Sequence, residues 1–122
     1  MRNDDDRYRR DLPATMEEMG IILLDGIRRW HNGGLVYHEG SRKYVENPNF
    51  WTVIIQKQDQ SLRITVYGEP DSFEYKGNKL SIGKDMKSYS SFKISNFYQV
   101  NDAISIIRKS YEMKNRYQKI HR

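Results

Sequence analysis

Apolar side chains recur every three or four residues between residues 16 and 30, which predicts an amphipathic helix with one buried face. The apolar positions of this face are Met16, Met19, Leu23, Ile27 and Trp30. Thr15 and Glu18 have the spacing of a capping box, and the glycines at 33 and 34 favour a left-handed cap. The helix is therefore expected to begin after Thr15 and to end before Gly33.

The middle of the chain alternates apolar and polar residues, which is the pattern of half-buried strands. Residues 50–57 and 62–67 are rich in β-branched and aromatic side chains, and the polar residues 58–61 between them predict a hairpin. Because residues 50–57 carry apolar side chains on both faces, this strand is expected to be central and covered on both sides. Shorter strands are expected at residues 35–38, 42–45, 80–82 and 92–94.

A second helical pattern fills the C-terminal region. Asn96 and Gln99 have the spacing of another capping box, and the apolar residues that follow lie on one helix face. These residues are Val100, Ala103, Ile104, Ile107 and Tyr111. A second row, offset from the first, predicts packing on the first helix or on a second copy of the chain; it consists of Ile106, Met113, Tyr117 and Ile120.

These patterns predict an α+β fold: an N-terminal helix, an antiparallel sheet of four to six strands and a long C-terminal helix packed on the sheet. The 122 residues suffice for one domain, and 15 aromatic residues argue against disorder. Residues 1–11 hold four aspartates and four arginines, so they are expected to form a flexible charged arm. The single folded domain is then residues 12–122.

Positive charge is concentrated at the end of the chain. Residues 108–122 carry six arginines and lysines against Glu112 alone, so this segment accounts for the whole net charge of +5. A basic segment of this kind suits a polyanion, although cations near a helix C-terminus also complement the helix dipole. Both interpretations remain open at this stage.

Aromatic side chains interleave with some of the cations, as in sites that bind phosphates through charge and bases through stacking. A solvated sheet face with extended lysines would have the same composition. The residues expected to contact an anionic, base-containing ligand are Arg28, Arg29, Arg63, Tyr67, Lys87, Tyr89, Arg108, Lys109 and Arg116.

The sequence contains no recognisable catalytic or metal-binding set. It has no cysteine, and its histidines (His31, His38 and His121) lack zinc-ligand spacing. Asp71 and the triplet 74–76 resemble the acidic and Glu-x-Lys elements of metal-dependent nucleases, but they lie too close together in a loop segment. We therefore expect no enzymatic activity, no metal and no cofactor.

The segment 92–112, with its Phe92-Lys-Ile-Ser-Asn start and its Ser110-Tyr111 near the end, resembles the closing strand and helix of a small bacterial domain family described as "predicted transport protein". Members of that family occur alone or fused to predicted nucleases. The same order of elements is similar to the MmcQ/YjbR-like group, which has an antiparallel sheet backed by helices. The resemblance covers about residues 48–112 and implies a fold, but it brings no catalytic residues.

The leading functional hypothesis from the sequence is a non-catalytic binding module for nucleic acid. The alternatives are a protein that binds or sequesters a nucleotide or signalling ligand, related to mobile elements or defence, and a module that dimerises through Ile106, Met113, Tyr117 and Ile120. No apolar run approaches the roughly 18 residues of a membrane span, and the N-terminus lacks an apolar signal core. No membrane contact and a cytoplasmic location are therefore expected.

Overall fold

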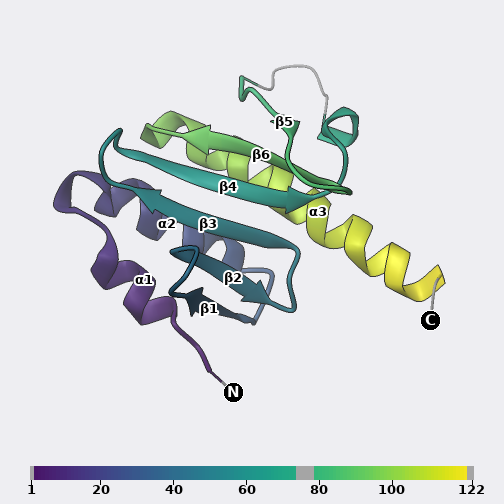
Figure 1. Ribbon diagram of the computed structural model, residues 1–122, viewed down its shortest axis with the longest axis horizontal. Helices are drawn as coiled ribbons and strands as arrows, with labels where there is room; N and C mark the ends of the chain where they lie inside the picture. Colours follow the sequence, from purple (N-terminus) through teal and green to yellow (C-terminus); the bar gives the residue numbers. More distant parts are fainter. Residues whose placement is uncertain (1, 74–78, 121–122) are drawn as a thin grey trace.

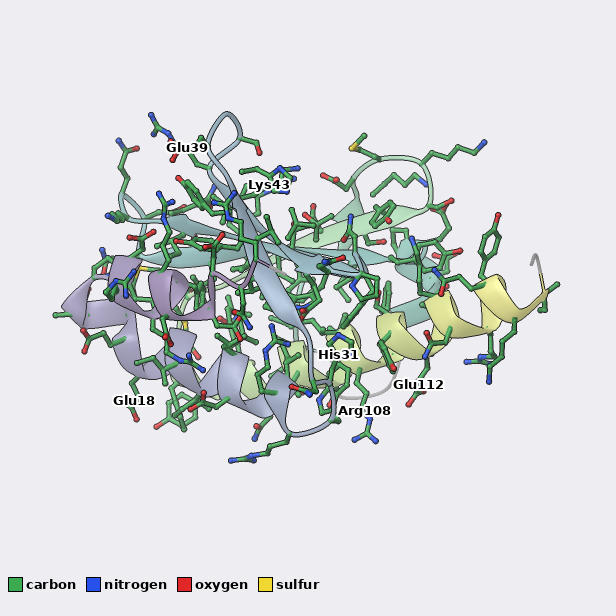
Figure 2. The ribbon with its side chains drawn as sticks, turned by 90° about the horizontal axis from the view of Figure 1, so that it is seen from below. Glu18, His31, Glu39, Lys43, Arg108 and Glu112 are labelled. Atoms are coloured by element: carbon green, nitrogen blue, oxygen red, sulfur yellow. The ribbon has the colours of Figure 1, made fainter. Side chains whose placement is uncertain are left out.

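The computed structural model describes residues 2–73 and 79–120 of the chain. Within them, six strands form one antiparallel sheet in the order β1-β2-β3-β4-β6-β5 (Figure 1). The three α-helices lie on one side of this sheet (Figure 2). The predicted α+β class, with an N-terminal helix and a long C-terminal helix, is confirmed.

The elements have the following bounds. The helices are α1 (Asp5–Asp11), α2 (Glu17–Arg28) and α3 (Val100–Ile120), with short 3-10 turns η1 (Ala14–Met16), η2 (Pro70–Phe73) and η3 (Phe97–Gln99). The strands are β1 (Gly34–His38), β2 (Lys43–Asn47), β3 (Trp51–Gln56), β4 (Ser61–Tyr67), β5 (Gly83–Lys84) and β6 (Tyr89–Ile94).

The core lies between the sheet and the helices because each inner strand alternates apolar and polar residues. Leu62, Ile64 and Val66 of β4 are fully buried, and the register places Phe92 of β6 beside Ile64. α2 and α3 cover this face, and Ser110 of α3 donates a hydrogen bond of 2.8 Å to the carbonyl of Phe50 at the start of β3. The pattern therefore positions both long helices on the same side of the sheet.

The position of β3 between β2 and β4 confirms the prediction of a central strand, but the prediction of cover on both faces is wrong. Trp51 and Val53 are fully buried under the helices, whereas Ile54 on the opposite face is only half-buried. No described helix lies on that side (Figure 2). The predicted strand at 80–82 is also displaced, since β5 is Gly83–Lys84.

The charged N-terminus corrects the prediction of a flexible arm. Residues 5–11 form α1, and Tyr8 at its centre has no exposed surface. The Tyr8 hydroxyl donates a hydrogen bond of 2.8 Å to the carbonyl of Gly20, and burial raises the pKa of this phenol. Asp6 and Arg10 of this short helix are exposed, whereas Tyr8 and Asp5 are buried and fix the helix to α2.

The helix ends also differ from the predicted ones. α2 stops at Arg28, five residues before Gly33, because the chain must turn back into β1 at Gly34. Thr15 lies in η1, and its hydroxyl bonds Gln60 across the molecule rather than capping α2. Before α3, the Gln99 side chain accepts a hydrogen bond of 2.7 Å from the amide of Ser95, one residue before the expected Asn96.

The apolar row proposed for dimerisation is divided by the fold. Ile106 is 1% exposed and belongs to the core, so it is unavailable to a second subunit. Met113 is half-buried against the core, and only Tyr117 and Ile120 are largely exposed, at the end of α3 that extends beyond the sheet (Figure 1). The row is therefore not a continuous surface.

Candidate nucleic-acid interface

Four of the C-terminal cations share the outer face of α3. At 100° per residue, these four positions fall within about 100° of one another around the helix axis. We call them the basic face; its members are Arg108, Lys109, Arg116 and Lys119, and all four are exposed. The concentration of charge in the sequence therefore becomes a concentration on one surface.

The basic face contains one carboxylate, that of Glu112. Arg108 and Glu112 point away from the sheet on the outer side of α3 (Figure 2). The Arg108 Nε lies 3.8 Å from the Glu112 Oε1, a spacing of four residues on an exposed helix. Pairs of this kind contribute about 0.3–0.5 kcal/mol, so Glu112 offsets little of the local positive charge.

The cations on strands β4, β5 and β6 differ from those of the basic face, because each of them is paired with a carboxylate. The pairs are Arg63 with Asp85, Lys84 with Glu69 and Lys93 with Asp59. The Arg63–Asp85 distance is 2.7 Å and the Lys93–Asp59 distance is 3.0 Å. In contrast, Lys109, Arg116 and Lys119 contact no carboxylate within the described residues.

Tyr67 and Tyr89 do come together, as part of an aromatic cluster at the ends of β4 and β6. Their ring centroids are 5.6 Å apart, and Lys114 of α3 lies 4.6 Å from the centroid of Tyr67. Lys114 also donates a hydrogen bond of 3.0 Å to the Tyr89 hydroxyl. Because Lys114 and Arg116 are about 160° apart around the helix, this cluster and the basic face look in nearly opposite directions.

Arg28 differs from the other predicted ligand residues, because its guanidinium is engaged by two carboxylates inside the protein. Its Nε and Nη2 donate to both carboxylate oxygens of Asp5, at 2.8 and 3.1 Å. Its Nη1 and Nη2 donate to both oxygens of the fully buried Glu46, also at 2.8 and 3.1 Å. Trp51 and the amide of Leu35 complete the carboxylate hydrogen bonds. This buried ionic cluster joins α1, α2 and the first three strands.

The pKa values of the cluster follow from its geometry. Burial alone would lower the pKa of Arg28, but hydrogen bonds and charge attraction from Asp5 and Glu46 outweigh it and raise that pKa. Burial alone would raise the pKa of Asp5, yet the bonds from Arg28 and Leu35 lower it. Both shifts favour the charged forms, so Arg28 and Asp5 remain ionised at neutral pH.

His31 adds a pH-dependent element beside this cluster. Its ring packs on Phe50 and Tyr111, at centroid distances of 5.0 Å each, and its Nε2 has no hydrogen-bond partner in the described residues. Burial lowers the pKa of His31; the negative charge of Glu46 opposes this shift, and Arg28 reinforces it. The neutral ring is therefore the form that suits the folded state.

We expect the protein to lose stability as the pH falls below about 6.5, the ordinary pKa of histidine. The unfolded chain then binds a proton at His31 that the folded protein resists, so acidification favours unfolding. His31→Phe keeps a ring against Phe50 and Tyr111 but cannot titrate, so its unfolding free energy should fall less between pH 7.5 and 5.5. Urea unfolding at the two pH values measures this, and an equal fall in both proteins would contradict the role of His31.

Two further predicted ligand residues are exposed but lie in different places. Arg29 follows the last residue of α2 and precedes Trp30, and the guanidinium of Arg108 lies 5.7 Å from the Trp30 ring centroid. Arg29 is therefore the sequence neighbour of a residue that Arg108 contacts. Lys87 lies in the connection between β5 and β6. The nine predicted residues do not form one site.

The described residues give no support to the nuclease-like or metal-binding sites considered from the sequence. Asp71 is exposed in η2, while the Glu-x-Lys triplet at 74–76 lies outside the described residues. Within the described parts of the chain, no group of three or more His, Asp or Glu side chains is arranged to hold a metal ion. None of the helices described there combines the length and the apolarity that crossing a membrane requires.

Comparisons with protein-family models, with curated proteins and with solved structures find no match.

Two basic residues of α3 were not singled out as ligand residues from the sequence, Lys114 and Lys119. Their positions carry a usable signal: Lys114 is three residues after Tyr111, on the buried side, and Lys119 is three after Arg116, on the outer side.

Proposed function

We propose that this protein is a non-catalytic module that binds nucleic acid through the basic face of α3. The observation that supports this proposal is the difference in pairing: the cations of β4 to β6 have carboxylate partners, and three of the four on the basic face have none among the described residues. Unpaired cations on one surface provide the electrostatic term that dominates non-specific binding.

The dimensions of the basic face suit a phosphate backbone. Arg108 and Lys119 are eleven residues apart, which corresponds to about 16 Å along a helix. Duplex DNA carries about ten phosphate charges over that length. The members of the face are flexible cations, and the aromatic cluster of Tyr67 and Tyr89 faces nearly the opposite way, so the expected contacts are with the backbone and not with base edges.

The first test is the salt dependence of binding to a fluorescein-labelled 20-base-pair DNA duplex, measured by fluorescence anisotropy. About four phosphate contacts predict a slope near −3.6 in a plot of log affinity against log salt. Affinity should then fall about 100-fold between 50 and 200 mM salt. Absence of binding at 50 mM salt, or binding with no salt slope, would remove the proposal.

The second test compares two double variants with the same loss of charge. Arg116→Gln with Lys119→Gln removes two cations of the basic face, and should weaken binding about 50-fold at 0.1 M salt and reduce the slope by about two. Lys84→Gln with Lys93→Gln removes two cations that already have carboxylate partners, and should have little effect. Equal losses in both would show that net charge alone is sensed.

A third variant changes the affinity in the opposite direction. Glu112→Gln removes the carboxylate of the basic face and frees Arg108, so binding should strengthen several-fold with a small change in helix stability. An unchanged affinity would place the nucleic acid on another surface.

A further inference from the structure

A cleft of about 670 Å³ lies apart from the basic face, since none of its lining residues belongs to α3. Its walls are α1, the tip of the β1–β2 hairpin, one edge of β3 and the turn between β3 and β4. Its lining includes Arg7, Asp11, Tyr37, Arg42, Tyr44, Ile55, Lys57 and Asp59. None of them was predicted as a site residue from the sequence.

The cleft exists because β2 and β3 separate after a short ladder. Their paired positions are Tyr44 with Val53 and Val45 with Thr52. Arg42, which would lie opposite Ile55 in a longer ladder, has a φ of 55° and belongs to the turn before β2. A left-handed residue turns the chain away from the strand path. Among the residues that the structure describes, the edge of β3 beyond Val53 is therefore left without a neighbouring strand.

The free edge presents one backbone donor and one backbone acceptor. The amide of Tyr67 donates a hydrogen bond of 3.1 Å to the carbonyl of Phe50, which fixes the alternation of bonds between β3 and β4. In an antiparallel ladder every second residue directs its amide and carbonyl to the other neighbour. Following the register, Ile55 directs both groups away from β4, to the side where β2 is missing.

One wall of the cleft is aromatic and held in place. The guanidinium of Arg7 lies 4.0 Å from the ring centroid of Tyr37, and the rings of Tyr37 and Tyr44 are 4.7 Å apart. The Tyr44 hydroxyl donates a hydrogen bond to Asp11. Burial raises the pKa of Tyr44, and the bond to Asp11 adds to this shift. The phenol remains a donor, and the wall is ordered before any ligand arrives.

The acidic side chains of the cleft have hydrogen-bond partners, whereas two of its basic side chains contact no carboxylate in the described part of the chain. Asp11 is engaged by Tyr44, and Asp59 accepts hydrogen bonds from Ser61 at 2.6 Å and Lys93 at 3.0 Å. Arg42 and Lys57 contact no carboxylate in the described part of the chain. The cleft therefore has satisfied acids and unsatisfied bases, and it complements an acidic ligand.

We propose that this cleft binds a short, extended, acidic peptide segment that pairs with Ile55 as an added strand. The free amide and carbonyl supply the main-chain hydrogen bonds of strand addition, and Tyr37 and Tyr44 contact alternate side chains of the segment. Arg42 and Lys57 at the open rim bind its carboxylates. The lining is largely polar, unlike the mostly apolar lining of a small-molecule pocket, which favours a peptide. This inference is independent of nucleic-acid binding.

The test uses the peptide acetyl-Glu-Val-Glu-Val-Glu-amide as probe and the amide NMR spectrum of the ¹⁵N-labelled protein as readout. Binding should shift the Ile55 amide and slow its hydrogen exchange at least fivefold, because a strand-paired amide is protected. The matching lysine peptide should not bind. Shifts at Arg42 and Lys57 without protection of Ile55, or equal shifts with inorganic phosphate or succinate, would overturn the proposal in favour of a small-anion site.

Matched variants separate this cleft from the basic face. Arg42→Gly removes the cation but suits the left-handed backbone, so the hairpin tip is retained. Arg42→Gly and Lys57→Gln should each weaken peptide binding about fivefold. Lys109→Gln should leave peptide binding unchanged while weakening the binding of duplex DNA. Unchanged peptide affinity in both cleft variants would overturn the proposal without affecting the proposed function.

Discussion

Replacing Arg28 by alanine is expected to lower the free energy of unfolding by about 3–5 kcal/mol, because it leaves two buried carboxylates without their cation. Glu46 has no exposed side-chain surface and Asp5 has 12%, so water cannot replace the guanidinium at Glu46. The loss is a large fraction of the roughly 5–15 kcal/mol that stabilises a domain of this size. Urea unfolding at pH 7.5, followed by tryptophan fluorescence, measures it.

The neighbouring arginine provides the control for this prediction. Arg29 is exposed, and within the described residues no carboxylate contacts it, so Arg29→Ala should change the unfolding free energy by no more than about 0.5 kcal/mol. Equal effects at the two positions would mean that the buried ionic cluster contributes nothing beyond helix propensity. A small effect of Arg28→Ala would mean that Asp5 and Glu46 find other partners.

Gly68→Ala is expected to destabilise the fold by about 3 kcal/mol, through backbone strain and overpacking together. Gly68 follows β4 with a φ of +129°, a conformation that side chains rarely allow. An added Cβ would also lie 2.6 Å from the Met113 Cε and 2.8 Å from the Phe73 Cζ. Thermal unfolding by circular dichroism measures the loss.

The same substitution has a second readout, because Met113 precedes Lys114 on α3. Displacing Met113 should disturb the packing of Lys114 on Tyr67, which the NMR shifts of the tyrosine rings report. Gly40→Ala is the control: nothing lies within 4 Å of its added Cβ, so its stability should be nearly unchanged. A wild-type melting temperature in Gly68→Ala would show that the end of β4 adapts at little cost.

The basic face depends on the fold more than its position in the sequence suggests. Cations near the end of a helix also complement its dipole, and the sequence left both interpretations open. In the fold, α3 buries Ala103, Ile106 and Ile107 against the sheet, which fixes the rotation of the helix. The rotation turns Arg108 and Arg116 outward, and the proposed interface follows from that orientation.

The candidate binding residues whose grouping could be predicted are those on regular elements, because helix and strand periods relate sequence spacing to a shared face. The spacing of Arg108, Lys109 and Arg116 places them together, and the pairing of β4 with β6 places Tyr67 opposite Tyr89. Arg28 could not be assigned in this way. Its partners, Asp5 and Glu46, are 23 and 18 residues away, and no local pattern indicates such a contact.

The cleft also could not be predicted from local patterns, because it is built from segments that are distant in the sequence. Its walls come from α1, the β1–β2 hairpin and β3, and α1 itself was interpreted as a flexible arm because its composition is so charged. The buried side chain of Tyr8 reverses that interpretation. Burial of one aromatic side chain stabilises by a few kcal/mol, which outweighs the exposed charges beside it.

The amino-acid sequence alone determined the α+β class, the central hairpin, the long C-terminal helix and the concentration of positive charge at its end. These features depend on local periodicity and composition, which are properties of neighbouring residues. Tertiary structure decided which arginine is buried, which cations have partners and where two strands separate to leave a cleft. Those outcomes depend on contacts between distant segments, whose free energies are fixed only when the whole chain is packed.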